Sequence, residues 1–367
     1  MNLDRVEKIA NAVLYEGYIL YPYRPTAVKN QQRWNFGALC PPSYSQAQGE
    51  TEACLMQTEC LVRGDERTTL DVKVRFLHLL AREVGKLTPP LQELPEGELP
   101  DFQTLAAMEV GGQIYQTWQE AVEREVRAEG FNLDELIAAG GRRQAFTFPS
   151  NLETQPLREP GGQTLGVIVR RQQEIEGAIE MRVEDCGLRI DKTEQWSFNP
   201  QSPIPNPRLF KVTVRILNLT SMLDAQLKSR DDALMRSLVS THTILTVRDG
   251  EFVSLLEPPP SLREMAASCR NTGTWPVLVG EEGERDCMLS SPIILYDYPQ
   301  IAPESAGDLF DGTEIDEILT LRIMTLTDEE KREMRGVDEH ARRILERTET
   351  LHPEQMMKLH GMMKGKD

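Results

Sequence analysis

The side chains best suited to chemistry are few and widely separated in this sequence. Among five histidines, His242 has hydroxyl neighbours in the run Ser240-Thr241-His242-Thr243, where an imidazole could transfer protons. A strand histidine held by a neighbouring hydroxyl is the commoner role of such a residue. The C-terminal segment carries thioether and imidazole groups that suit a soft metal ion, namely Met356, Met357, His360, Met362 and Met363. Methionine also serves as adaptable packing, so both interpretations of this segment stay open.

No motif of a known catalytic or cofactor site occurs in the chain. A GxGxxG loop after a strand, GxxxxGK[ST], HExxH and GxSxG are all absent. The six cysteines contain no CxxC pair, and buried apolar packing is the simpler role for Cys54 and Cys60. The sequence therefore predicts no catalytic residue, no metal site and no cofactor, and it favours a non-enzymatic role.

Residues 15–42 form a segment rich in aromatic and cationic side chains, YEGYILYPYRPTAVKNQQRWNFGALCPP. Pro22 and Pro25 prevent it from continuing as a helix or a central strand. Aromatic residues and arginine are enriched where proteins bind each other, although the same groups can clamp a segment within one chain. A second proline-punctuated run, Tyr296–Pro303, is of the same kind. The predicted partner-binding residues are Tyr21, Tyr23, Arg24, Arg33, Trp34, Tyr296 and Tyr298.

The composition limits the partners that this chain can have. Lys and Arg total 41 and Asp and Glu total 58, so the net charge is −17. Such a field repels phosphate backbones, which argues against a nucleic-acid partner. No run of about 18 apolar residues predicts a membrane span, and the acidic N-terminus does not resemble a signal peptide. Together with the cysteine pattern, this predicts a cytoplasmic protein whose partner is another protein. The oligomeric state stays open.

The hydrophobic pattern predicts a strand-dominated α+β protein, with an antiparallel β-sandwich between an N-terminal helix and C-terminal helices. Apolar residues at helical spacing predict a helix from Leu3 to Glu16. Short β-branched runs broken by Gly or Pro after residue 160 predict the sandwich. We expect three parts: an α+β unit at 1–155, the β-sandwich at 156–312, and C-terminal helices with a tail at 313–367.

Several local features follow from turn and capping signals. Alternating apolar residues on both sides of Gly64-Asp65 predict one hairpin, and Arg248-Asp249-Gly250 predicts a second. The proline-rich stretch at 86–101 predicts a loop, and residues 149–163 predict a linker or a long crossover. Thr327 with Glu330 predicts a capping box that opens one long helix ending near Arg347.

Four stretches of the chain resemble a family of uncharacterised bacterial proteins. They are the segment 15–42, THTILTVRDGEFVSLLEPP (241–259), TWPVLVG (274–280) and the run that begins SSPIILYDYPQ (290–331). Members of that family are encoded beside nickel–iron uptake hydrogenases. The resemblance implies an accessory or assembly factor that acts through protein–protein contacts with a hydrogenase subunit or maturation factor. It is an association by genomic position and supplies no catalytic residues. The alternatives are a metal-handling protein or hydrolase-like enzyme that uses His242 or the Met/His tail, and a structural subunit of a larger complex.

Overall fold

The structure is a computed structural model, and it describes residues 3–14, 36–95, 97–189, 207–300, 323–336 and 339–350. The helices are α1 (Leu3–Leu14), α2 (Pro42–Ala47), α3 (Leu133–Ala138), α4 (Arg230–Leu234), α5 (Arg263–Ala267), α7 (Asp328–Arg335) and α8 (Glu339–Glu349), with short 3-10 turns η2 (Ala225–Leu227) and η3 (Pro260–Leu262). The strands are β1 (Leu55–Leu91), β2 (Phe102–Leu105), β3 (Ala107–Val110), β4 (Gln113–Gln116), β5 (Trp118–Asn132), β6 (Arg142–Phe148), β7 (Asn151–Arg158), β8 (Thr164–Gln172), β9 (Ile175–Arg189), β10 (Arg208–Asn218), β11 (Val239–Val253), β12 (Trp275–Leu278) and β13 (Cys287–Ser291).

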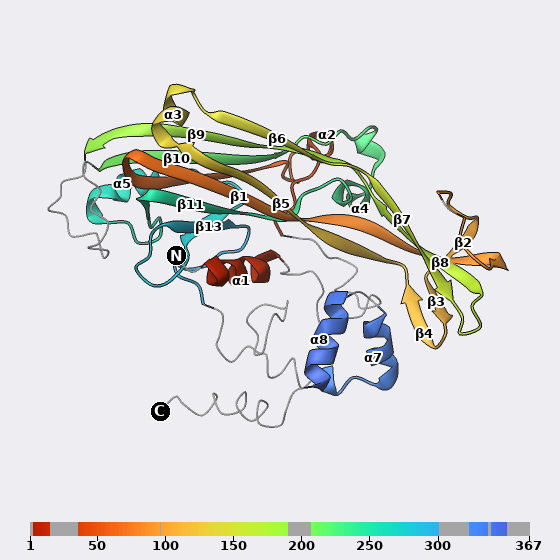
Figure 1. Cartoon of the computed structure of the whole chain (residues 1–367). Helices are drawn as coiled ribbons and strands as arrows, with labels where there is room; N and C mark the ends of the chain where they lie inside the picture. Colours follow the sequence, from red (N-terminus) through yellow and green to blue (C-terminus); the bar gives the residue numbers. More distant parts are fainter. Residues whose placement is uncertain are drawn as a thin grey trace.

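Strand β1 is the axis of the fold and pairs with different strands along its 37 residues (Figure 1). Its first part, 55–64, pairs with β10. Its middle part lies between β11 and β5, and its last part pairs with β8 and β2. All these pairings are antiparallel, so β1 joins eleven strands into one sheet, while β3 and β4 form a separate pair. The predicted strand-dominated α+β class is confirmed.

The main core lies where this sheet folds back on itself. Phe76 of β1 packs against Phe146 and Phe148 of β6, with ring centroids 6.1 and 5.7 Å apart, although β6 forms no ladder with β1. Figure 1 shows β6, β9 and β10 stacked over β1, β5 and β11. Alternate residues of both layers point into the space between them, as expected for sheet-on-sheet packing. The large sheet contains strands that precede residue 155 and strands that follow it. The division of the chain into three units stays a prediction.

Both predicted hairpins are wrong, because β1 and β11 each continue as one strand through the residues where a turn was expected. The register between them shifts between Gly64 and Thr69, which lie opposite Gly250 and Arg248. The Thr68 hydroxyl accepts a hydrogen bond from the Asp65 amide (2.8 Å) and donates one to the Asp249 carbonyl (2.6 Å). The two turn signals therefore mark a bulge in β1 and the bend in β11 beside it.

Three other local predictions need correction. Strand β1 continues to Leu91, so only the later part of 86–101 is irregular. The expected linker at 149–163 contains strand β7, which pairs with β8. The capping box at Thr327 is confirmed, but the single long helix is wrong, because α7 ends at Arg335 and α8 begins at Glu339. Arg335 and Glu349 form an ion pair of 2.7 Å between these two helices.

Helices α1, α7 and α8 pack on the sheet through apolar clusters separate from the main core. Helix α1 begins at Leu3 as predicted and packs its apolar side on Ile244, Val277 and Leu289. The α7–α8 pair contributes Met334 and Leu345 to a cluster that also contains Leu77 and Leu79 of β1. Helix α1 therefore packs on β12 and β13, and the site described next lies in the segment that follows β13.

Candidate functional site

The structure describes two of the seven predicted partner-binding residues, Tyr296 and Tyr298. The other five, Tyr21, Tyr23, Arg24, Arg33 and Trp34, lie outside the described residues. From Phe36 onward the aromatic–arginine segment is bonded to the start of β11, with the Leu39 amide donating to the Leu238 carbonyl (2.8 Å). Whether the earlier part is a clamp or a surface stays open.

Tyr296 is the most exposed of the large hydrophobic residues that the structure describes, with 85% of its surface accessible. It follows β13 in a segment whose side chains alternate between outside and inside. Ile293 and Leu295 pack against the cluster beneath α1, whereas Ile294 and Tyr296 point outward. The inward residues therefore fix the segment and present the outward ones.

Asp297 anchors the chain directly after Tyr296. One carboxylate oxygen accepts a hydrogen bond from the Ser254 hydroxyl (2.5 Å), and the other accepts from the Leu278 amide (2.8 Å). Ser254 also accepts from the Glu257 amide (2.8 Å). Asp297 thus ties the segment to the end of β11 and to edge strand β12.

Tyr298 completes this anchor from the inside. Its amide donates to the Leu278 carbonyl (2.7 Å) and its hydroxyl donates to the Glu284 carbonyl (2.9 Å). Its ring packs against the main core, and burial raises the pKa of its phenol. The backbone has φ of +54°, a left-handed conformation that is strained for a tyrosine. The surrounding bonds hold this strain, so Tyr298 is a positioning residue for its exposed neighbour.

A cavity of about 400 Å³ opens beside these residues. Leu256, Leu278 and Tyr296 supply apolar surface to it, while Glu257, Glu282 and Arg285 supply charge. Leu256 is itself 52% exposed. The site is therefore an open, partly apolar hollow with carboxylates at its rim, of a kind that receives a side chain from a partner.

Near this cavity, the charged groups Glu251, Arg63 and Arg285 interact with one another. Glu251 pairs with Arg63 at 3.6 Å, and burial raises the pKa of Glu251 although Arg63 and Arg285 both oppose that shift. Among the described residues, the buried Nε of Arg285 has no hydrogen-bond partner. The described part of the chain therefore leaves one N–H of the Arg285 guanidinium at the cavity wall without an acceptor.

His242 lies in β11 and is fully buried, which rules out direct contact with a substrate in this conformation. Its Nδ1 lies 3.1 Å from the backbone carbonyl of Ser240, so the expected hydroxyl partner is wrong. Its Nε2 has no partner among the described residues. Burial lowers the pKa of His242 to about 3, and Arg75 adds to that shift. The imidazole is therefore neutral at physiological pH, without a carboxylate to orient it for acid–base work.

The described residues offer no group of His, Cys, Asp and Glu side chains that could hold a metal ion. The predicted Met/His tail (Met356, Met357, His360, Met362, Met363) lies outside them. All six cysteines are free; Cys60 is buried as expected, whereas Cys54 is half-buried. In the part of the chain that the structure describes, every helix is too short or too polar to cross a membrane.

Sequence reasoning missed Ser254, Leu256 and Arg285, which come from two loops distant in the chain. Only Asp297 carried a local signal, because a carboxylate between two tyrosines is unusual in an otherwise apolar run. The sequence could not reveal what that carboxylate bonds.

No family model and no curated protein matches this chain. Among solved structures, one match is the Salmonella SPI-1 type III secretion injectisome secretin InvG (residues 176 to the end) in the open gate state. It has 8% sequence identity, covers 59% of this chain and 81% of that chain, and gives a TM-score of 0.08. A TM-score this low carries no argument about fold or function.

Proposed function

We propose that this chain is a non-enzymatic accessory factor that binds another protein through the surface around Tyr296. One observation carries the proposal: a tyrosine that is 85% exposed lies between residues fixed to the sheet, beside an open cavity. Because the anchors already order the backbone, a partner that covers Tyr296 loses little further conformational entropy. Rigid aromatic side chains of this kind dominate the free energy of many protein interfaces.

The rim of the cavity supports a partner of defined chemistry. Glu257 and Glu282 are exposed there, and the whole chain carries −17. An apolar side chain in the cavity with Lys or Arg residues around it is complementary to this surface. Its association rate should fall with added salt, because screening removes the steering between opposite charges.

The resemblance of residues 15–42, 241–259, 274–280 and 290–331 to proteins encoded beside nickel–iron hydrogenases supports a particular partner. We propose a hydrogenase subunit or maturation factor in that role. This second step rests on association by genomic position alone, so it is tested separately from the surface itself.

The test is affinity purification of the tagged chain from its native host, followed by mass spectrometry and a binding titration with the recovered partner. Tyr296→Ala should weaken binding about tenfold or more, as for an interface hot spot, while the melting temperature stays unchanged. Leu152→Ala is the matched control, since Leu152 is an exposed apolar residue (49%) in β7. In Figure 1, β7 lies toward the opposite end of the sheet from β13.

Equal binding by Tyr296→Ala and wild type would exclude this surface. A partner unrelated to hydrogenases, lost on the same substitution, would leave the surface standing and reject the hydrogenase step.

A further inference from the structure

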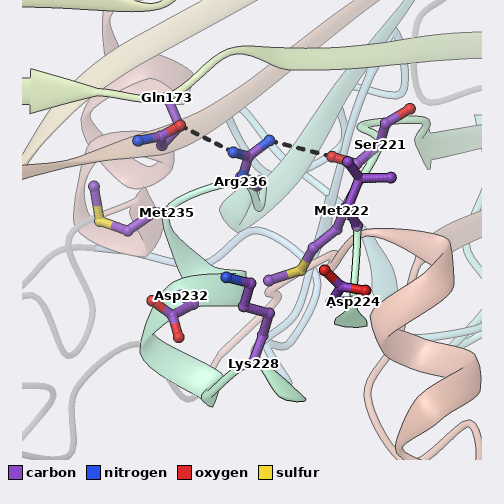
Figure 2. A pocket seen from close by; sticks show the side chains of 9 residues that line it. Gln173, Ser221, Met222, Asp224, Lys228, Asp232, Met235 and Arg236 are labelled. Atoms are coloured by element: carbon purple, nitrogen blue, oxygen red, sulfur yellow. Dashed lines mark hydrogen bonds between the residues drawn. The ribbon is translucent and has the colours of Figure 1, made fainter. Parts of the chain in front are cut away.

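A second cavity, of about 500 Å³, lies between the β8–β9 turn and residues 221–236 (Figure 2). It shares no lining residue with the cavity beside Tyr296. Its wall combines two cations, two carboxylates and three large apolar side chains. The lining residues are Gln173, Ser221, Met222, Leu223, Asp224, Lys228, Asp232, Met235 and Arg236.

Arg236 holds the centre of the wall, and its partners are neutral. One guanidinium nitrogen donates to the Ser221 carbonyl (3.2 Å), and another donates to the Gln173 side-chain oxygen (3.1 Å). Figure 2 shows both bonds and places the guanidinium between these two partners. In the part of the chain that the structure describes, no carboxylate forms an ion pair with Arg236. A half-buried guanidinium with fixed orientation and unused N–H groups suits the planar fork of a carboxylate.

The other charges of the cavity favour a ligand with one negative charge. The Asp232 carboxylate is occupied at the start of α4, where it accepts from the Ser229 amide (3.0 Å) and hydroxyl (2.7 Å). The ammonium end of Lys228 extends from below toward the cavity, with Asp232 and Asp224 on either side (Figure 2). The two cations and two carboxylates of the described wall cancel, so Arg236 can hold one carboxylate by hydrogen bonds while no excess cation remains to neutralise a second negative charge.

The remaining wall suits an apolar chain. Met222 and Met235 contribute flexible, polarizable side chains that adapt to ligands of differing shape. Leu223 is 83% exposed at the rim, where it can cover a bound chain. The described wall thus combines a polar anchor with an apolar patch, and small-molecule sites use both kinds of group.

We propose that this cavity binds a small amphipathic monocarboxylate, with its carboxylate on Arg236 and its apolar chain against Met222 and Met235. This site is independent of the protein-binding surface proposed above, and either can fail without the other.

Isothermal titration calorimetry of the full chain with octanoate tests the proposal, and 1-octanol serves as the uncharged probe of equal chain length. Octanoate should bind at one site per chain, and octanol should bind at least tenfold more weakly because it lacks the charge-assisted bonds. Arg236→Gln should weaken octanoate binding by a similar factor, and Arg236→Lys should retain part of the affinity. Arg143→Gln removes the same charge from an exposed position on β6 and should bind like wild type.

A second pair of variants keeps the test decisive if Arg236→Gln fails to fold. Leu223→Glu adds a repelling carboxylate at an exposed rim position and should weaken octanoate binding, whereas Leu223→Gln should bind more tightly than Leu223→Glu. Absence of octanoate binding to the wild type, equal binding of octanoate and octanol, or equal octanoate binding by Leu223→Glu and Leu223→Gln would overturn the proposal.

Discussion

At the residue scale, the candidate surface separates the side chain that is presented from those that hold it. Tyr296 is exposed, whereas Asp297 and Tyr298 bond to the backbone of β12 and the loop before β13. The exposed residue can therefore change without cost to the fold, and the anchors cannot.

Asp297→Ala should lower the free energy of unfolding by about 1–3 kcal/mol, because the Leu278 amide and Ser254 hydroxyl both lose their acceptor. Hydrogen exchange at the Leu278 amide should accelerate in the same variant. Asp297→Asn keeps one oxygen acceptor and should lie between the variant and the wild type. Unchanged protection of Leu278 in Asp297→Ala would contradict the assigned anchor.

The buried histidines His78 and His242 predict how stability depends on pH. In the unfolded chain a histidine takes up a proton near pH 6.5, whereas burial lowers the folded-state pKa to about 3 for His242 and about 4 for His78. Because the folded pKa values are depressed, the stabilising contribution is present above pH 6.5 and is lost as pH falls below it. Between its folded-state pKa and pH 6.5, each histidine should change the free energy of unfolding by about 1.4 kcal/mol per pH unit.

In His242→Leu, one fewer side chain takes up a proton on unfolding. The free energy of unfolding should therefore depend less steeply on pH between about pH 6 and pH 4.5. Urea denaturation at several pH values measures the slope directly, and an unchanged urea dependence of the unfolding free energy serves as the control. A slope identical to wild type would show that His242 becomes protonated in the folded state.

At the element scale, the paired bulge and bend let β1 and β11 turn together while staying hydrogen-bonded. A Cβ atom added to Gly64 would lie 2.3 Å from the Thr68 hydroxyl oxygen, and one on Gly250 would lie 2.7 Å from the Thr68 methyl. Both glycines therefore make room for one buried threonine. The bend redirects β1 from its partner β10 toward β5, and this change of partner folds the sheet over its core.

Thr68→Val should destabilise the fold by about 2–4 kcal/mol, since the Asp65 amide and the Asp249 carbonyl both lose their bond to the hydroxyl. Thr68→Ser retains that hydroxyl and should cost less. Thermal or chemical unfolding of the two variants measures the difference. Equal stabilities would show that the hydroxyl does not hold the bulge.

At the scale of the whole molecule, helices α7 and α8 are attached to the sheet near residues 77–82 of β1. Met334 and Leu345 pack with Leu77 and Leu79, and a guanidinium nitrogen of Arg82 donates to the Gly336 carbonyl (3.3 Å). Arg82 also pairs with Glu120 at 3.0 Å, so β1, β5 and the end of α7 meet at one buried cation. Gly336 also lies directly against the Ile114 backbone of β4.

Gly336→Ala should loosen this attachment, because the added Cβ would lie 2.3 Å from the Ile114 carbonyl oxygen of β4. Hydrogen–deuterium exchange should increase across α7 and α8 while the centre of β1 stays protected. Gly161→Ala is the matched control, since no atom lies within 4 Å of a Cβ there and its φ is ordinary. Equal exchange in both variants would argue against tight packing of Gly336 on β4.

The sequence by itself determined the strand-dominated class, helix α1, the N-terminal cap of α7, and one exposed aromatic residue of the candidate site. These features depend on local periodicity, on a capping side chain or on a short aromatic run, which neighbouring residues specify. Only the tertiary structure decided that Gly64-Asp65 and Arg248-Asp249-Gly250 are a bulge and a bend, because each is stabilised by Thr68 bonding across two strands.

Neither cavity could be predicted from the sequence, because both depend on hydrogen bonds between residues far apart in the chain. Asp297 forms hydrogen bonds with Ser254 and Leu278, and Arg236 forms them with Gln173 and Ser221. The bonded residues lie up to 63 positions apart in the sequence. Such pairings depend on which strands become neighbours, and β1 sets those neighbours by changing partners along its length. Local sequence signals contain no record of that choice, so the composition of each site emerged only once the sheet was folded.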